Sequence, residues 1–288
     1  MFAFIHIFHR LRVSFNKLED SVIEIANGNL DKEIDIPNES LLIEITLSIK
    51  KMTERLKNQI IRLKQLEEYK SDFFQNVSHE IKTPITAINS AIELLQTKNS
   101  IKNTDKECFD IIQFQTQSIN KLVNDILCLS EIDLEKTGEK KSFKQFNLNQ
   151  MIRNTINYLM PKDVQIIFIE NCIADISADE ELLATALSNL IINALKYSES
   201  DKIEVILLME NNHIVLQVKD YGIGIPEKHL DRIFERFYRV DKNRSRESGG
   251  TGLGLSIVKN VVELHNGDIT VFSEPNKETV FTIILPKA

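Results

Sequence analysis

A long apolar stripe with helical spacing constrains this chain more than any other feature of its sequence. Over residues 42–66 the apolar side chains recur at alternating intervals of three and four residues, with one slip, as in a heptad repeat. Such a stripe is typical of a lone amphipathic helix on a core or of a helix seam between two chains. Its length and its continuation into the next segment favour the seam. The stripe consists of Leu42, Ile45, Ile49, Met52, Leu56, Ile60, Leu63 and Leu66.

The stripe continues over residues 70–97 and returns over residues 105–134, after a polar loop at 98–104. These two segments predict an antiparallel helical hairpin. Each arm shows a single apolar stripe, so the hairpin alone buries little, and we expect it to pair with a second copy into a four-helix bundle. The first arm carries Phe74, Val77, Ile81, Ile85, Ile88, Ile92 and Leu95, and the second carries Cys108, Ile112, Ile119, Leu122, Ile126 and Leu129.

The last half of the chain has a different pattern. After a charged linker at 135–142, short β-type runs alternate with helical ones, which predicts an α+β domain with a largely antiparallel sheet. The β-type runs are 164–170, 202–210, 213–220, 268–274 and 279–286, and the helical runs are 147–159, 179–198 and 253–265.

The N-terminal segment leaves two interpretations open. Its apolar run covers only residues 1–8 and is followed by Arg10 and Arg12, where a membrane span needs about 20 residues. It resembles the last two turns of a transmembrane helix, or else it is a frayed apolar end of a soluble chain. An amphipathic helix over 13–30, stopped by Gly28, and a polar connector over 31–40 follow it.

Charge and cysteine usage exclude some classes of function. Lys and Arg number 35 and Asp and Glu number 42, a net charge of −7, so bulk electrostatics disfavour nucleic-acid binding. The three cysteines are far apart and form no CxxC pair, which indicates reduced structural thiols. The chain has only 9 glycines, and six of them fall between positions 222 and 254. This clustering predicts a special backbone conformation there.

His79 is the first candidate for chemistry. It lies two residues from the stripe positions Val77 and Ile81, about 200° around a helix from both, so it points away from the seam. Thr83 shares its face, and Glu80 lies on the flank. A neutral imidazole is nucleophilic at pH 7, and Glu80 can accept the proton of its other ring nitrogen. The alternative is a solvated surface histidine.

Three further clusters point to a nucleotide. Asn189, Asn193 and Lys196 share one stretch of a helix, where amide oxygens suit Mg²⁺ and an ammonium suits phosphate. Asp220 ends a strand before two glycines and can accept a hydrogen bond from an exocyclic amine such as that of adenine. Four glycines at 249–254 lead into a helix, whose backbone donors suit phosphate. These clusters fit neither a Walker loop nor the dinucleotide fingerprint.

Between the glycine clusters lies a basic segment, residues 233–248, which predicts a lid that closes over a nucleotide. Its aromatic residues are candidate anchors and its arginines are candidate phosphate ligands. The anchors are Phe234, Phe237 and Tyr238, and the arginines are Arg236, Arg239, Arg244 and Arg246.

Taken in order, these motifs resemble those of the sensor histidine kinases of two-component signalling, over nearly the whole chain. SHEIKTP (78–84) is similar to the phospho-acceptor motif. Four further segments resemble the asparagine, first glycine, phenylalanine and second glycine boxes of the ATP-binding domain. They are NLIINALKYS (189–198), DYGIGI (220–225), IFERFYRVD (233–241) and GGTGLGLSI (249–257).

The resemblance implies roles for individual residues. His79 would accept the γ-phosphoryl group of ATP, with Glu80 as the adjacent general base and Thr83 supporting phosphatase activity. Asn193, with Asn189, would hold Mg²⁺. Lys196 and Arg239 would contact phosphates, Tyr197 would line the nucleotide, and Asp220 would bind the adenine amine. The pocket and lid would be shaped by Gly222, Gly224, Gly250, Gly252, Gly254 and Leu255.

The resemblance also implies an organisation. Residues 1–10 would be a remnant of a transmembrane helix, 11–66 a HAMP-like signal-relay segment, 67–136 a dimerisation and phosphotransfer domain, and 143–288 the ATP-binding domain. The fold would be a dimeric four-helix bundle of long helices followed by an α/β sandwich with a mixed sheet. The proline usual near the start of HAMP is missing here.

The implied partners are a second copy of the chain, ATP, Mg²⁺ and the receiver domain of a response regulator, with no nucleic acid. The implied location is the membrane, with the catalytic part in the cytoplasm, the alternative being a soluble cytoplasmic protein. Two rival functions are an ATPase of the gyrase or chaperone type without phosphohistidine, and a catalytically silent relay. The outward His79 argues against the first and the intact nucleotide motifs argue against the second.

Overall fold

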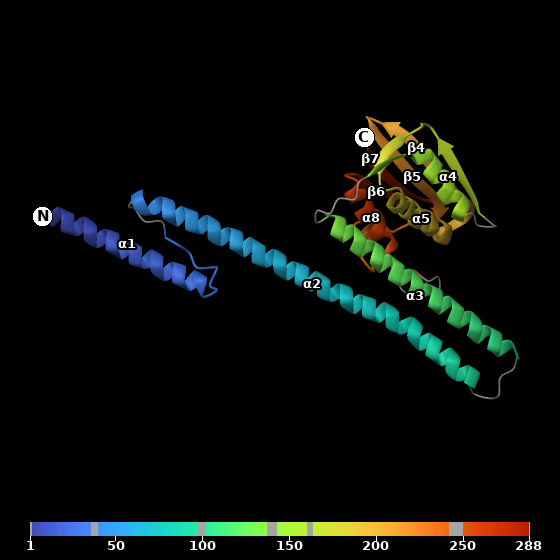
Figure 1. Cartoon of the computed structure of the whole chain (residues 1–288), viewed down its shortest axis with the longest axis horizontal. Helices are drawn as coiled ribbons and strands as arrows, with labels where there is room; N and C mark the ends of the chain where they lie inside the picture. The colour runs from blue at the N-terminus through green and yellow to red at the C-terminus, as the bar shows by residue number, and fades with distance from the viewer. Residues whose placement is uncertain are drawn as a thin grey trace. The chain divides into compact units, whose positions relative to one another are not determined.

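The computed structural model describes residues 2–35, 40–96, 102–136, 143–159, 164–241 and 250–287. The chain divides into two compact units, residues 1–75 and 76–288. Figure 1 shows the helices and strands along the chain.

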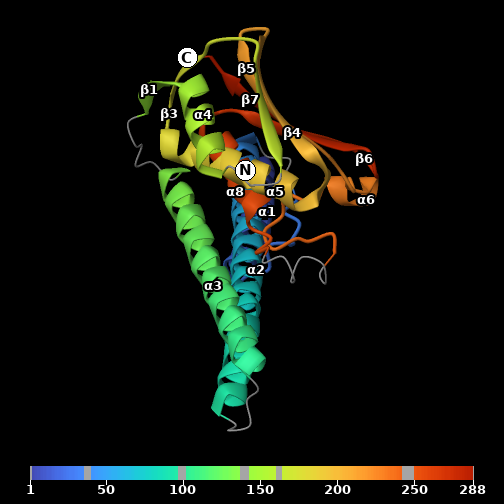
Figure 2. The ribbon, with the colours of Figure 1, turned by 90° about the vertical axis from the view of Figure 1, so that its right-hand side faces the viewer.

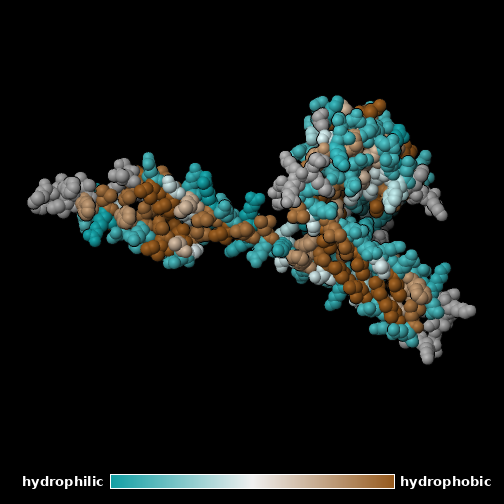
Figure 3. Space-filling model, in the orientation of Figure 1, coloured by the Kyte–Doolittle hydropathy of each residue, from teal (hydrophilic) through white to brown (hydrophobic). Residues whose placement is uncertain are grey.

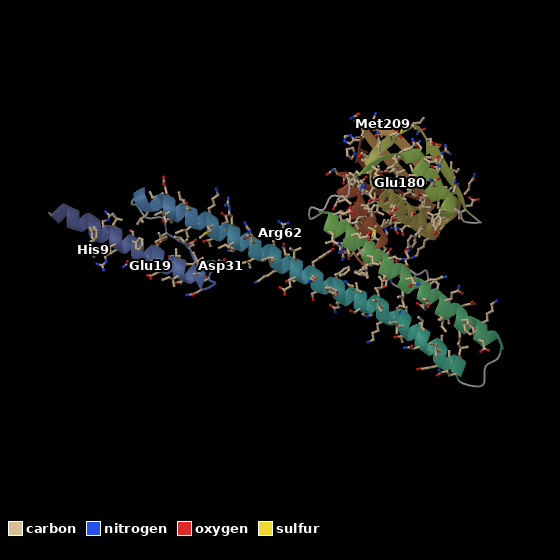
Figure 4. The ribbon with its side chains drawn as sticks, in the orientation of Figure 1. His9, Glu19, Asp31, Arg62, Glu180 and Met209 are labelled. Carbon is tan, nitrogen blue, oxygen red and sulfur yellow. The ribbon has the colours of Figure 1, made fainter. Side chains whose placement is uncertain are left out.

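The first unit contains helix α1 (Phe2–Ala26) and the beginning of helix α2 (Ser40–Gln96). Gly28 has a φ of +99° and follows the end of α1, as expected for a left-handed residue that stops a helix. Within this unit α1 and the start of α2 run in the same direction (Figure 1). Ile34 of the connector is buried between them, and Asp31, labelled in Figure 4, pairs with Lys57.

None of the described helices combines the length and the apolar character that a bilayer-spanning helix requires.

The predicted seam on α2 is largely exposed in the single chain. Every residue from 54 to 72 is exposed, including those around Arg62 in Figure 4. Met52, Leu63 and Leu66 of the heptad stripe each expose more than half of their surface. Figure 3 shows apolar side chains gathered along this helix. A lone helix that exposes such a stripe lacks the burial that stabilises it, which fits a seam that a second chain covers.

The second unit begins with a hairpin formed by the end of α2 and by α3 (Lys102–Lys136), which run antiparallel (Figures 1 and 2). The loop predicted at 98–104 lies partly outside the described residues, and α3 begins within it. Pro84 lies inside α2 and does not end the helix. Cys108, Leu122 and Leu129 of the predicted α3 stripe are buried. On the first arm the buried residue is Ala91, which the predicted stripe did not include, whereas Phe74, Ile85 and Ile92 of that stripe are exposed.

The expectation of a single apolar stripe on each arm was wrong for α3. This helix carries a second, exposed apolar face, which is visible in Figure 3 as part of the band along the hairpin. The predicted stripe of α3 packs on the rest of the second unit. The second apolar face is not covered within the described part of the chain and is available to another protein surface. This face consists of Phe109, Val123, Leu127 and Leu134.

The rest of the unit is an α/β sandwich built on a five-stranded mixed sheet of order β2-β4-β5-β7-β6. Strands β2 and β4 are parallel, and the other neighbours are antiparallel. The strands are β2 (Gln165–Glu170), β4 (Ser198–Glu210), β5 (His213–Gly222), β6 (Asp268–Glu274) and β7 (Glu278–Pro286). All five match the predicted runs. Two short strands, β1 (Lys144–Asn147) and β3 (Asp175–Ala178), form a separate antiparallel pair that the sequence did not predict.

Helices pack on one face of the sheet, and the hydrophobic core lies between these helices and the sheet (Figure 2). The helices are α4 (Leu148–Leu159), α5 (Glu180–Tyr197) and α8 (Gly254–Leu264), with the short α6 (Glu227–Leu230) near the sheet edge. Asp179 caps α5 by accepting a hydrogen bond from the Leu182 backbone N–H at 3.0 Å. Leu190 of α5 and Ile257 of α8 are fully buried, and alternate residues of β5 face them.

The hairpin packs directly on this core. Leu122, Leu129 and Ile132 of α3 belong to the same buried cluster as the helices of the sandwich. Polar contacts flank this apolar junction. Arg236 pairs with Asp133 at 3.1 Å, and the Thr251 hydroxyl donates to Asp125 at 2.7 Å. The junction therefore holds the loops before α8 against α3.

We expect Leu190→Ala to lower the free energy of unfolding of this domain by about 2–5 kcal/mol, because it leaves a cavity between α5 and the sheet. Ile173→Ala is the matched control, since Ile173 is 81% exposed, and should change it by no more than about 0.5 kcal/mol. The measurement is urea unfolding followed by tyrosine fluorescence, because the chain has no tryptophan. Equal effects of the two substitutions would contradict the assigned core.

Candidate functional site

A cavity of about 400 Å³ opens between α5, the end of β5 and the segment before α8. Most of the residues singled out by the motifs line it, although they are spread along the chain from Asn189 to Leu255. Those that line it are Asn189, Asn193, Lys196, Tyr197, Asp220, Gly224, Arg239, Gly250, Gly252, Gly254 and Leu255.

Helix α5 supplies the amides and an ammonium group. Asn189, Asn193 and Lys196 lie on the side of α5 that faces the cavity, at intervals of four and three residues. Asn189 is buried, and a side chain at position 254 would meet its Oδ1 at 3.0 Å, so Gly254 allows α8 to begin against this amide. Burial, together with the positive charges of Lys121 and Arg239, lowers the pKa of Lys196 to about 8.

Asp220 is the buried carboxyl group of the site. It lies at the end of β5 and lines the cavity. Burial raises its pKa to about 6, although the Gly222 backbone N–H stabilises the charged form. Asp220 is therefore largely ionised at pH 7 and can accept a hydrogen bond from a ligand in a partly desolvated place.

Two glycines are required where β5 leaves the sheet. A Cβ at position 222 would lie 2.0 Å from the Tyr197 carbonyl oxygen, so only glycine fits there. Gly222 does not itself line the cavity, and its role is to let the chain pass α5. Gly224 has a φ of +67° and lies against the Glu274 backbone, where a Cβ would approach to 2.6 Å.

A backbone hydrogen bond connects the first part of the predicted lid to the glycine loop before α8. The Phe237 N–H donates to the Gly252 carbonyl at 2.8 Å, and both residues have positive φ. Phe234, Phe237 and Tyr238 pack against the core, as expected for anchors. Of the predicted arginines, Arg239 lines the cavity, whereas Arg236 contacts Asp133 of α3 instead of the cavity. Arg244 and Arg246 lie outside the described residues.

Arg239 connects the cavity to the histidine motif. Its Nη2 donates to Glu80 Oε2 at 2.6 Å, across 159 positions of the chain. The side chain is only 9% exposed, and its Nε is buried without a hydrogen-bond partner among the described residues. A buried guanidinium N–H without an acceptor, on a side chain that lines a cavity, is suited to an anionic ligand.

His79 lies on the exposed surface of α2, next to Glu80, as predicted. Thr83 is also exposed, and its hydroxyl donates to the His79 carbonyl at 3.2 Å, one turn earlier in the helix. Neither His79 nor Thr83 lines the cavity, and among the described residues the hydrogen bond between Arg239 and Glu80 joins the histidine motif to the cavity.

Sequence reasoning missed several residues that line the cavity. Thr279 and Phe281 lie on β7, which is adjacent to β5 only in the folded sheet. Thr251 stands inside the glycine motif, and its hydrogen bond to Asp125 has no signal in the sequence. Lys121 lies on α3 and reaches the cavity because of the way the hairpin packs.

Comparison with known proteins accounts for this combination of a histidine hairpin and a nucleotide-like cavity. Residues 69–135 match the His Kinase A (phospho-acceptor) domain family. Residues 178–288 match the family of histidine kinase-, DNA gyrase B- and HSP90-like ATPases. Together the two families account for more than half of the chain. The chain belongs to the sensor histidine kinases.

Among curated members of this family, the chain is similar to the sensor protein kinase WalK. It is 36% identical to the protein of Staphylococcus saprophyticus over 299 residues, covering 96% of this chain and 48% of that protein. It is 37% identical to that of Staphylococcus aureus over 242 residues, covering 80% of this chain and 56% of that protein. The chain thus spans about half the length of these relatives.

Solved structures of histidine kinases share the fold. A structure of histidine kinase ThkA in complex with response regulator protein TrrA aligns with a TM-score of 0.60 and 26% identity, covering 82% of this chain and 66% of that chain. Histidine kinase AdeS of Acinetobacter baumannii aligns with a TM-score of 0.56 and 20% identity, covering 73% of this chain and 98% of that chain. The second likeness concerns the fold alone.

The low pKa of Lys196 gives a pH-dependent prediction. A bound polyphosphate should raise this pKa, so binding of ATP near pH 8 should take up protons, and affinity should fall as the pH rises through about 8. Calorimetry in two buffers of different ionisation enthalpy measures the uptake. Lys196→Gln should abolish it, and release of protons at pH 8 would contradict the assignment.

Proposed function

We propose that this chain is an ATP-dependent protein-histidine kinase that phosphorylates His79 and passes the phosphoryl group to an aspartate of a response regulator. The observation that carries the proposal is the contact between Arg239 and Glu80. It joins a cavity with nucleotide-binding features to the carboxylate next to an exposed histidine. Both matched domain families support it.

ATP would bind in the cavity with its adenine at Asp220, whose carboxylate would accept from the exocyclic amine. Tyr197 and Leu255 would line the nucleotide, and Lys196 and Arg239 would contact the phosphates. The glycines would allow the backbone to approach the ligand closely and to close the lid over it. They are Gly222, Gly224, Gly250, Gly252 and Gly254.

Mg²⁺ would be held by Asn193 and Asn189. The described part of the chain contains no group of three or more His, Cys, Asp or Glu residues that could hold a metal. The donors fit a hard cation, because both amides line the cavity and the phosphates of ATP would complete the coordination. When bound, the ion would neutralise charge that develops on the phosphate oxygens.

The transfer itself would need positioning more than covalent chemistry. One ring nitrogen of His79 would attack the γ-phosphorus, forming a P–N bond while the bond from phosphorus to the bridging oxygen breaks and ADP leaves. Glu80 would accept the proton from the other ring nitrogen. Lys196 and Arg239 would stabilise the negative charge on the leaving ADP.

In the arrangement described here Glu80 is held by Arg239. For Glu80 to act as a base, Arg239 would have to exchange its carboxylate for a phosphate oxygen of the nucleotide. Arg239 lines the cavity, and its Nε has no hydrogen-bond acceptor among the described residues, so the side chain has a donor to offer such a ligand. Binding of ATP would thus free the Glu80 carboxylate to act as a base and bring the phosphoryl donor in the same step.

The second half of the reaction would take place on the hairpin. The structure of ThkA with TrrA shows a similar kinase bound to a response regulator. We place the corresponding surface of this chain on the outer face of the bundle below His79. Thr83, one turn from His79, would orient a water for the reverse hydrolysis that gives phosphatase activity.

Residues 67–136 would dimerise the kinase. The exposed face of α3 and the stripe of α2 lack a cover in the single chain, and a four-helix bundle would bury both.

Residues 11–66 would relay a signal to this bundle as a HAMP-like segment, and residues 1–10 would contribute to a membrane attachment, with the catalytic part (143–288) in the cytoplasm. The alternative is a soluble cytoplasmic kinase.

The decisive experiment uses γ-labelled ATP with Mg²⁺. The native chain should acquire an acid-labile, base-stable label, and His79→Gln should acquire none, because the phosphoryl acceptor is absent. His213→Gln is the matched control, since His213 is exposed on the sheet and should leave labelling unchanged. Asp220→Asn should lower labelling by about tenfold or more through weaker ATP binding.

A label that survives in His79→Gln would contradict the assignment. Steady ATP turnover without any label would favour an ATPase of the gyrase or chaperone type. Neither label nor turnover would favour a silent relay.

The bundle can be tested separately. We expect Leu127→Asp to convert a dimer into a monomer, because it places a charge on the exposed apolar face of α3. Asn124→Asp introduces the same charge at an exposed position on this helix and should leave the dimer intact. Light scattering coupled to size-exclusion chromatography measures the mass, and a Leu127→Asp protein that stays dimeric would exclude this face from the interface.

A further inference from the structure

One residue of the nucleotide cavity comes from outside the ATP-binding domain. Lys121 lies in the middle of α3, on the hairpin, and lines the cavity together with Asn193, Lys196 and Arg239. Among the described residues that line the cavity, it is the one contributed by the hairpin. The cavity is therefore a composite of the two parts of this unit.

The place of Lys121 is fixed by a buried polar contact one turn further along α3. Asp125, four residues on, accepts a hydrogen bond of 2.7 Å from the Thr251 hydroxyl, and both side chains are buried. The same hydroxyl accepts from the Leu253 backbone N–H at 3.3 Å. The glycine loop before α8 is thus attached to α3 beside Lys121.

Lys121 interacts electrostatically with Asp125 on its own helix and with Lys196 across the cavity. Asp125 is the acidic group near it, but burial raises the pKa of Asp125, while the Thr251 hydroxyl and Lys121 favour its charged form. Toward the cavity Lys121 faces Lys196, and its charge helps to lower the pKa of that lysine. Within the described part of the chain Lys121 forms no ion pair.

Lys121, Lys196 and Arg239 bring three cationic groups to one cavity, and an anion bound between them would reduce their mutual repulsion. A second, independent observation comes from Arg239, which lines the same cavity. The Nε of Arg239, on a side chain nine-tenths buried at the same cavity, has no acceptor among the described groups. Convergent ammonium groups and an unpartnered guanidinium N–H are the donors that a polyphosphate requires.

We propose that Lys121 is a nucleotide-binding residue that the helical hairpin contributes to the ATP site, where its ammonium group contacts the phosphates. This inference rests on the proposed function and extends it. The nucleotide phosphates would lie between α3 and the ATP-binding domain, so their binding would strengthen the contact between them. Adenosine, which lacks phosphates, would not engage Lys121.

The test compares ADP with adenosine on the whole chain. Lys121→Gln should weaken ADP binding about tenfold, the scale of a lost charged hydrogen bond, and leave adenosine binding unchanged. Lys121→Arg should keep most of the affinity for ADP. Lys106→Gln is the matched control, because Lys106 lies exposed on the same helix and does not line the cavity. Calorimetry measures ADP binding, and a ligand-observed NMR titration measures adenosine binding.

The outcomes separate this inference from the function on which it rests. Unchanged ADP affinity in Lys121→Gln would overturn the role of Lys121 and leave the kinase assignment standing. Equal weakening of ADP and adenosine would also overturn it, because Lys121 would then only support the packing of the cavity. A native chain that binds neither ligand would overturn the proposed function and this inference together.

Discussion

A buried arginine joins the two chemical parts of this molecule. Arg239 lies at the base of the lid, lines the cavity of the ATP-binding domain and donates to Glu80 on the hairpin at 2.6 Å. Removing a guanidinium group from water costs free energy unless its donors find acceptors, and here one carboxylate supplies only part of what it needs. Its Nε has no hydrogen-bond partner among the described residues, so the ion pair is compatible with a competing anionic ligand. The proposed order of events, in which nucleotide arrival releases Glu80, follows from this incomplete satisfaction.

The apolar junction beneath Arg239 makes this contact possible. Leu122, Leu129 and Ile132 of α3 are buried in the same cluster as the helices of the sandwich, so α3 packs on the ATP-binding domain through its predicted stripe. Thr251 and Asp125 add a buried hydrogen bond at the glycine loop. Because this stripe is used within the chain, the second apolar face of α3 is left for another copy. One helix thus accounts for the docking of the domain, for the third cation at the cavity and for the proposed dimer.

Local patterns in the sequence predicted most of the fold and many of the residues that line the cavity. Periodicity located the long helices, the five strands of the main sheet and the outward face of His79, because these depend on which residues are neighbours along the chain. Patterns of this kind carry no information about contacts between distant segments. The pairing of β1 with β3, the partner of Arg239 and the place of Lys121 at the cavity all depend on how α3 packs on the sandwich. Arg236 illustrates the same limit. Its charge and its place in the lid predicted a contact with phosphate, whereas in the folded chain it forms an ion pair with Asp133 of α3.

In the proposed mechanism Glu80 and a nucleotide phosphate compete for Arg239. ATP affinity measured in a double-mutant cycle tests this competition. We expect Glu80→Gln to tighten ATP binding several-fold, because the guanidinium no longer pairs with a carboxylate, and the gain to disappear in an Arg239→Gln background. Unchanged or weaker ATP binding in Glu80→Gln, or a gain that persists without Arg239, would contradict it.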